Sequence, residues 1–289
     1  MALPTMARGW TRATALEWCR GIDEGPYSSI SCGERTTFHN TEVLVTNAAG
    51  AALTERVRVF VNLIVLPLHP IPVIAKQLAT MDVLCDGRLT VGVGVGGREH
   101  DYLAAGAPME RRHQRLDDGV AELRRIWSGE PPFEGATPVG PPCVQAGGPP
   151  LLAGAMGPKA LARAARWADG ISGFALGADG AEMAAAVHGA RAAWEDAGRS
   201  AAPKVVSGCF FALGGEDPRA ALSGFTYDYL EIFGRRFARG MADEAPVWNG
   251  DRLLRALDDA RAAGVDEFIL VPATVDPGCL HATTALLTS

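Results

Sequence analysis

The sequence has no apolar run long enough to cross a bilayer and no N-terminal secretory segment. A membrane-spanning helix needs roughly 20 consecutive apolar residues, whereas the longest apolar run, 57–68, contains Arg58 and Asn62. We therefore expect a cytoplasmic protein that does not associate with membranes.

The cysteines and the charge exclude two further classes of protein. The six cysteines include no C-x-x-C pair and no zinc-like grouping with histidine, which predicts reduced thiols and no metal site. The formal net charge of −6 argues against a general polyanion binder, so we expect no nucleic-acid partner. A small-molecule substrate is then the expected partner.

The chain does have enough apolar sequence for a large core. Its 289 residues are 48% hydrophobic, which suits either one α/β barrel or two smaller domains. No linker and no solenoid-like repeat divides the chain, so we expect one domain over residues 1–289. Only three residues precede Pro4, which predicts a short or truncated first strand.

Strand-like runs alternate with helical patterns along the chain. Strands are predicted at 1–3, 28–32, 57–66, within 84–97, and at 151–154, 171–174, 204–213 and 267–272. Helices are predicted at 11–20, 41–54, 73–84, 98–105, 109–127, 159–167, 181–197, 218–236 and 251–263. Eight strands alternating with helices are typical of a single-domain TIM (β/α)8 barrel. The Pro- and Gly-rich loop 128–148 is expected to cover a site.

A glycine-rich strand end is the most distinctive stretch of the sequence. Gly92–Gly97 matches G-x-G-x-x-G, and Asp117 follows about 20 residues later, as in a Rossmann dinucleotide site. That site needs its acidic residue at the end of a second strand, whereas Asp117 lies in a helical stretch. A P-loop is excluded because no Lys-Ser or Lys-Thr follows the glycines. Two interpretations of these glycines remain: they allow close approach of a ligand, or they allow close packing at a barrel rim.

A second small-residue loop is the better site for an anion. Gly154–Pro158 follows a strand and leads into a helix that begins with Lys159. Free backbone N–H groups at such a point favour phosphate. An ordinary strand-to-helix turn is the alternative.

Polar residues follow the strand at 28–32, where a barrel keeps its chemistry. Glu34, Arg35 and His39 are candidates for proton transfer or for orienting a ligand, and a solvated Glu-Arg pair is the alternative. Structural roles or a solvated, ion-paired surface are predicted for five other residues: His69, His113, Arg111, Arg112 and Arg115.

Several ordered motifs together resemble the bacterial luciferase-like flavin and deazaflavin oxidoreductases. The resemblance extends from about Ser28 to Pro272. Its motifs are Val65-Leu-Pro-Leu-His-Pro70, Ala75-Lys-Gln-Leu-Ala-Thr-Met-Asp82, Asp86-Gly-Arg-Leu89, the glycine-rich end, Arg111-Arg-His-Gln-Arg-Leu-Asp117, Ile126-Trp-Ser-Gly-Glu130, Leu152-Ala-Gly-Ala-Met-Gly-Pro158 and Ala168-Asp-Gly170.

This resemblance implies a luciferase-like TIM barrel that binds FMN or the deazaflavin coenzyme F-420, commonly as a homodimer. In the family a bulged strand end, often with a non-prolyl cis peptide, backs the coenzyme ring, and Asn62-Leu63 matches it here. Gly94, Val95 and Gly96 match the strand end that lines the coenzyme. Gly154, Ala155, Met156, Gly157 and Lys159 match the segment that holds its phosphate.

Two departures from the family bear on the reaction. Many relatives carry an Asp-His or Glu-His pair where this chain has Glu34-Arg35, and relatives that oxidise sugar phosphates have Glu where Gly97 stands. Sugar-phosphate oxidation is therefore not expected, and His39 is the residue that could replace the missing histidine.

Three functional hypotheses follow from the resemblance. The first is hydride transfer between F-420 and a small organic substrate. The second is an FMN-dependent monooxygenase, which the sequence barely separates from the first. The third is a non-catalytic flavin-binding protein on the same fold, since fold does not fix function.

Overall fold

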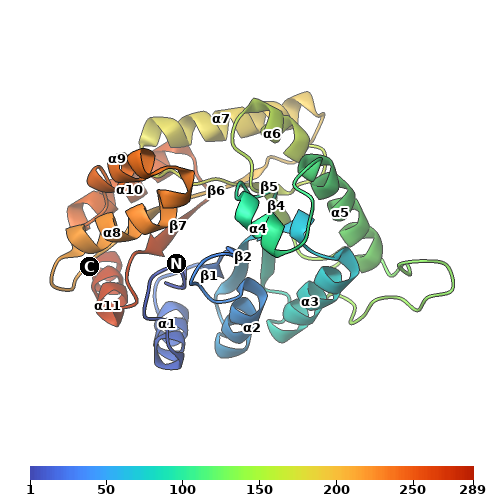
Figure 1. Ribbon diagram of the computed structural model, residues 1–289, viewed down its shortest axis with the longest axis horizontal. Helices are drawn as coiled ribbons and strands as arrows, with labels where there is room; N and C mark the ends of the chain where they lie inside the picture. Colours follow the sequence, from blue (N-terminus) through green and yellow to red (C-terminus); the bar gives the residue numbers. More distant parts are fainter.

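Parallel strands follow one another around a barrel in the computed structural model, which describes residues 1–289. The seven strands pair in sequence order, each parallel to the next (Figure 1). Their bounds are β1 Ser29–Cys32, β2 Arg58–Val65, β3 Leu89–Gly94, β4 Leu151–Ala153, β5 Gly170–Ser172, β6 Lys204–Phe211 and β7 Glu267–Pro272.

The first three residues complete the barrel between β1 and β7. The Ala2 N–H donates to Leu270 O at 2.8 Å, and the Leu3 N–H donates to Ser31 O at 2.7 Å. The N-terminus accordingly lies between these two strands in Figure 1. The structure thus has seven strands where eight were predicted, because residues 1–3 are too short to form a strand and make only an isolated bridge from Ala2 to Ser31 and the two hydrogen bonds above.

Helices surround the strands (Figure 1), and no helix has the length and apolar character needed to span a membrane. The prediction of one helix over 218–236 is wrong, because Gly234, at φ +119, breaks it. The helix at the C-terminal end was not predicted. The bounds are α1 Arg12–Glu24, α2 Val43–Leu53, η1 Leu66–Leu68, α3 Ile71–Leu84, α4 Glu99–Ala104, α5 Arg112–Trp127, α6 Pro158–Ala164, α7 Gly180–Asp196, α8 Pro218–Leu230, η2 Glu231–Phe233, α9 Arg235–Asp243, α10 Gly250–Ala263 and α11 Pro277–Thr288.

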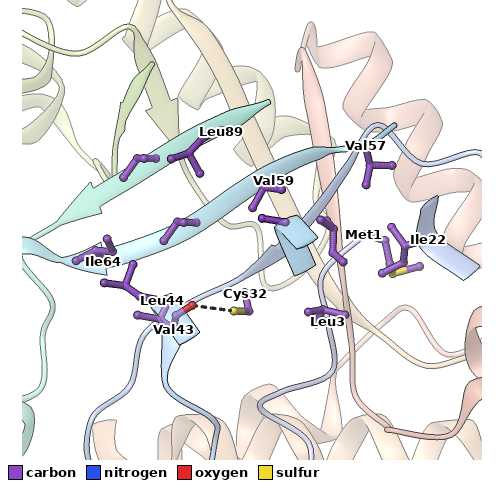
Figure 2. Packing of buried hydrophobic residues seen from close by; sticks show 14 of the residues in the cluster. Met1, Leu3, Ile22, Cys32, Val43, Leu44, Val57, Val59, Ile64 and Leu89 are labelled. Atoms are coloured by element: carbon purple, nitrogen blue, oxygen red, sulfur yellow. Dashed lines mark hydrogen bonds between the residues drawn. The ribbon is translucent and has the colours of Figure 1, made fainter. Parts of the chain in front are cut away.

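The largest apolar cluster lies between the strands and the helices around them (Figure 2). On β2, Val59, Val61 and Ile64 are all fully buried and belong to this cluster. Burying one such side chain contributes about 1.5–3 kcal/mol. Burial of these three side chains therefore holds β2 in place, and the carboxyl end of β2 forms part of the site described below.

The loop 128–148 does not cover the site, contrary to expectation. Its Gln145 N–H and Nε2 donate to the fully buried Asp82 carboxylate at 3.0 and 2.8 Å, and Nε2 also donates to Leu89 O. Leu89 opens β3, so this contact lies at the amino end of the strands. The loop joins a helix end to a strand start, which puts it on the face opposite the catalytic face of a barrel.

Candidate active site

A cavity of about 430 Å³ lies at the carboxyl ends of the strands. Its wall is formed by residues that end β1, β2, β4 and β5, together with residues of β6, β7, α4, α8 and η2. Drug-sized ligands occupy pockets of roughly 300–1,000 Å³. The cavity is therefore large enough for a flat coenzyme ring, and it lies on the face where TIM barrels carry out chemistry.

A bulge in β2 forms part of the cavity wall. The Asn62-Leu63 peptide is cis, and the register between β2 and β3 shifts between Val61 and Ile64. Both Asn62 and Leu63 line the cavity. The bulge and cis peptide thus occur at the two residues that the family resemblance indicated.

Glu34 holds this bulge from the neighbouring strand. Its backbone N–H donates to Leu63 O at 3.1 Å, while its carboxylate accepts the Val65 N–H at 2.6 Å. The preceding Gly33 allows this approach, because a Cβ there would lie 2.3 Å from Asn62 O. Glu34 thus supplies the hydrogen bonds that an irregular strand end would otherwise lack.

The glycines of β3 and β4 make room for Leu63. A Cβ on Gly92 or Gly94 would lie 3.1 Å from atoms of the Leu63 side chain, and one on Gly154 would lie 2.5 Å from its Cδ2. The close approach that the glycine-rich pattern indicated is therefore made by Leu63. Gly96 is different, because its φ of +60 favours glycine and its Cβ would meet Val65.

Two side-chain pairs place further polar groups at the bulge. Ser172 Oγ donates to Asn62 Oδ1 at 2.8 Å, so the Asn within the strand has its partner on β5. His69 Nε2 lies 2.7 Å from Glu34 Oε1, with 23% of the His69 side chain exposed. A structural role for His69 was expected; its contact with a residue of the cavity wall was not. The only sequence signal for it is the position of His69 after the bulged strand.

Arg35 and His39 have different environments. Arg35 is 6% exposed and lines the cavity, with its guanidinium carbon 3.7 Å from the Phe38 ring centroid and 4.3 Å from that of Tyr229. His39 does not line the cavity, and its Nε2 lies 2.9 Å from Met6 O. Of the three candidates that follow β1, Glu34 and Arg35 are therefore brought together at the cavity and His39 lies outside it.

A second arginine lies on the same wall. Arg98 Nε lies 3.2 Å from Asp101 Oδ2, and its Nη2 donates to Thr37 O at 3.0 Å. Asp101 Oδ1 accepts both the N–H and the hydroxyl of Thr37. Burial raises the pKa of the nearby Tyr229 phenol, with Arg98 lowering it by a smaller amount.

The segment after β4 lies between two cavities. Gly154 and Met156 line the main cavity, and Met156 also lines a neighbouring cavity of about 370 Å³ together with Ala155 and Gly157. The backbone N–H groups of Ala155, Met156 and Gly157 donate to no protein acceptor. Gly94, Val95 and Lys159 line neither cavity, and Lys159 is exposed.

The remaining charged candidates make structural contacts. Asp117 accepts from Trp167 Nε1 at 3.1 Å and pairs with Arg163, so it is not a ribose ligand of a Rossmann site. Arg115 donates to the carbonyls of Pro67 and Pro108, which ties α5 to the segment after β2.

The family model for luciferase-like monooxygenases matches residues 4–273. The chain belongs to this family. The family resemblance and the barrel fold predicted from the sequence are both confirmed, as is membership of a family of oxidoreductases and monooxygenases.

Curated relatives match parts of the chain. The F-420-dependent hydroxymycolic acid dehydrogenase of Mycobacterium tuberculosis is 29% identical over 191 residues, 61% of this chain and 48% of its own. An uncharacterised protein of the same organism is 33% identical over 134 residues, 45% of this chain and 46% of its own. The matched regions thus span less than half the length of these relatives.

Solved structures match over nearly the whole chain. Monooxygenase RslO1 from Streptomyces bottropensis has a TM-score of 0.79 at 20% identity and covers 100% of this chain and 98% of its own. An F-420-dependent secondary alcohol dehydrogenase, solved with an F-420-acetone adduct, has a TM-score of 0.76 at 14% identity, covering 99% and 96%. At these identities the likeness concerns the fold. A Baeyer-Villiger monooxygenase from Pseudomonas putida, solved in complex with FMN, also matches. It has a TM-score of 0.75 at 15% identity and covers 100% of this chain and 96% of its own. The matching structures therefore include complexes with either coenzyme.

Proposed function

We propose that this protein transfers hydride between coenzyme F-420 and a small organic substrate held in the main cavity. The observation that carries the proposal is the cavity of about 430 Å³ bounded by the Asn62-Leu63 bulge at the carboxyl ends of the strands. A bound coenzyme would supply the hydride chemistry. The chain supplies binding, orientation and electrostatics.

The residues around the cavity suit such a coenzyme. Asn62 and Leu63 of β2 and Gly96 would lie against the ring, and Gly94 and Val95 would lie behind them at the end of β3. Three successive backbone N–H groups at 155–157 have no protein acceptor and would donate to the phosphate. The exposed ammonium of Lys159 would add a positive charge there. The complete set is Asn62, Leu63, Gly94, Val95, Gly96, Gly154, Ala155, Met156, Gly157 and Lys159.

Glu34, Arg35 and His39 remain the candidates for handling the substrate. Glu34 lines the cavity and contacts His69, which is partly exposed, so this pair offers a route for a proton between the cavity and solvent. Arg35 keeps its charge at all working pH values and would orient a ligand rather than transfer a proton. His39 lies outside the cavity with its Nε2 beside Met6 O, so it would reach a substrate only if its side chain moved.

An FMN-dependent monooxygenase is the second candidate. It is favoured by the fold match to RslO1, a monooxygenase. F-420 is preferred because the relative that matches 61% of this chain is an F-420-dependent dehydrogenase. Non-catalytic coenzyme binding is the third hypothesis.

We also propose that the protein is a one-domain, cytoplasmic homodimer. Sedimentation at several concentrations would test the dimer.

The test is a titration of one purified sample with F-420 and with FMN. We expect F-420 to bind with micromolar or better affinity and FMN to bind more weakly. Lys159→Met should weaken F-420 binding by about tenfold, because Lys159 is exposed and its loss should cost about 1.5 kcal/mol, the lower limit for a charge-assisted hydrogen bond. Lys76→Met is the matched control, because Lys76 lies on α3 and donates to Gly140 O in the loop on the opposite face.

Each outcome selects among the hypotheses. Tighter binding of FMN, with transfer of an oxygen atom from O2 to an organic substrate when reduced FMN is supplied, would establish the monooxygenase. Binding of F-420 without oxidation or reduction of any alcohol, ketone or enone in a substrate panel would favour the non-catalytic role. If neither coenzyme binds, the proposal fails.

A further inference from the structure

The guanidinium of Arg35 is a buried cation with open hydrogen-bonding capacity. Its single hydrogen bond is donated by Nη1 to Tyr229 O at 3.0 Å, although a guanidinium has five N–H groups. Nε is buried and has no partner. Leaving a buried charged donor unsatisfied is costly, which points to a ligand that completes it.

No carboxylate of the protein neutralises this cation. The two acidic residues in the cavity wall are Glu34 and Asp101. Glu34 is engaged by the Val65 N–H and His69, and Asp101 by Thr37 and Arg98. The face of the Arg35 guanidinium lies over the aromatic rings of Phe38 and Tyr229. These rings offset part of the burial cost by cation–π attraction but accept no in-plane hydrogen bond.

Arg98 supplies a second open donor on the same wall. Its side chain is 10% exposed, and its Nη1 is buried without a hydrogen-bond partner. Two arginines, each with an unused buried donor, therefore line one cavity. Arginine donors suit the planar geometry of a carboxylate.

The rest of this part of the cavity is apolar. Phe174, Phe210 and Phe233 line it together with Tyr229. The Phe174 and Phe210 ring centroids are 4.7 Å apart, and those of Phe210 and Tyr229 are 5.0 Å apart. Such a cluster favours a flat or bulky apolar group.

We infer that the substrate is an apolar or aromatic carboxylic acid, whose carboxylate binds Arg35, with Arg98 as a second donor. The inference rests on the proposed function of the cavity and names the substrate class for it. A coenzyme phosphate is the other possible source of such an anion, and the experiment separates the two.

The test uses benzoate as the anionic probe and benzamide as its neutral counterpart, titrated calorimetrically into the full chain. We expect benzoate to bind more tightly than benzamide to the wild type. Arg35→Met should weaken benzoate binding by about 10- to 100-fold, and Arg35→Lys should weaken it less because the charge is kept. Exposed Arg255 on α10 gives the matched control, Arg255→Met, which should bind benzoate like the wild type.

Thermal melts of each variant confirm folding, and Arg35→Lys serves if Arg35→Met does not fold. The inference is overturned if benzoate binds no better than benzamide, or if binding is unchanged in the folded Arg35 variants. It is also overturned if Arg35→Met weakens F-420 or FMN binding tenfold and leaves benzoate binding intact, because the anion is then the coenzyme's. If benzoate binding depends on Arg35 but the wild type binds neither coenzyme, the proposed function fails and the anion site stands.

Discussion

Gly154→Ala should destabilise the protein by pushing Leu63 out of its place beside β3 and β4. The new Cβ would lie 2.5 Å from Leu63 Cδ2, far inside the roughly 3.5–4.0 Å at which carbon atoms attract. Overpacking of a well-packed core costs about 1–3 kcal/mol. We expect a cost near the lower limit, because the clashing atom is the end of a partly exposed side chain that lines a cavity. Because Leu63 lines the cavity, we also expect weaker coenzyme binding.

The sign of the effect should reverse when Leu63 is truncated. Leu63→Ala removes the clashing atom, and Gly154 carries no positive φ, so an alanine fits there. Gly154→Ala should then stabilise the Leu63→Ala protein by about 0.4–1 kcal/mol, because it reduces the entropy of the unfolded chain. Urea unfolding of the four proteins in this double-mutant cycle measures both values.

Gly224→Ala is the matched control for the alanine substitution. Gly224 lies in α8, is exposed, and would have no atom within 4 Å of its new Cβ. It should gain about 0.5–1 kcal/mol of stability. The reasoning is refuted if Gly154→Ala is as stable as the wild type, or if its cost is the same with and without the Leu63 side chain.

Three other predictions concern partly buried polar groups. Glu34→Ala should cost about 1–3 kcal/mol in urea unfolding, because the Val65 N–H loses its acceptor; Glu34→Gln keeps an acceptor, so an equal loss would argue against this explanation. Burial alone would raise the pKa of Glu267, but hydrogen bonds from Lys204 and neighbouring serines hold it below its usual value. The stability that this carboxylate gives is present above about pH 4.3 and is lost as the pH falls through the folded-state pKa. The urea midpoints of Glu267→Gln and the wild type should therefore converge in acid. A difference between the two midpoints that stays constant with pH would contradict this. Burial raises the pKa of Cys143 to about 11. Iodoacetamide at neutral pH should therefore label this thiol at least about tenfold more slowly in the folded than in the unfolded protein. Equal labelling rates would show that burial does not protect the thiol from alkylation.

The barrel was predictable because its signals are local. Strand 267–272 and the α3 boundary at Leu84 follow directly from apolar patterning, and β7 and α3 end as predicted. The break at Gly234 was missed because a single glycine inside an apolar pattern does not show its φ. The role of loop 128–148 was missed because composition does not tell which end of a barrel a loop joins.

The sequence by itself determined the order of the strands and of most helices, the family, and the two residues of the bulge, because periodicity and motif order are properties of the chain alone. Only the tertiary structure decided what the polar residues do. It brings His69 to Glu34 and leaves His39 beside Met6, and it fills the space above the glycines with Leu63. It also buries Arg35 against two aromatic rings without a counter-ion. Such contacts join residues far apart in the chain, and their partners are set by packing across the barrel rather than by spacing along the sequence.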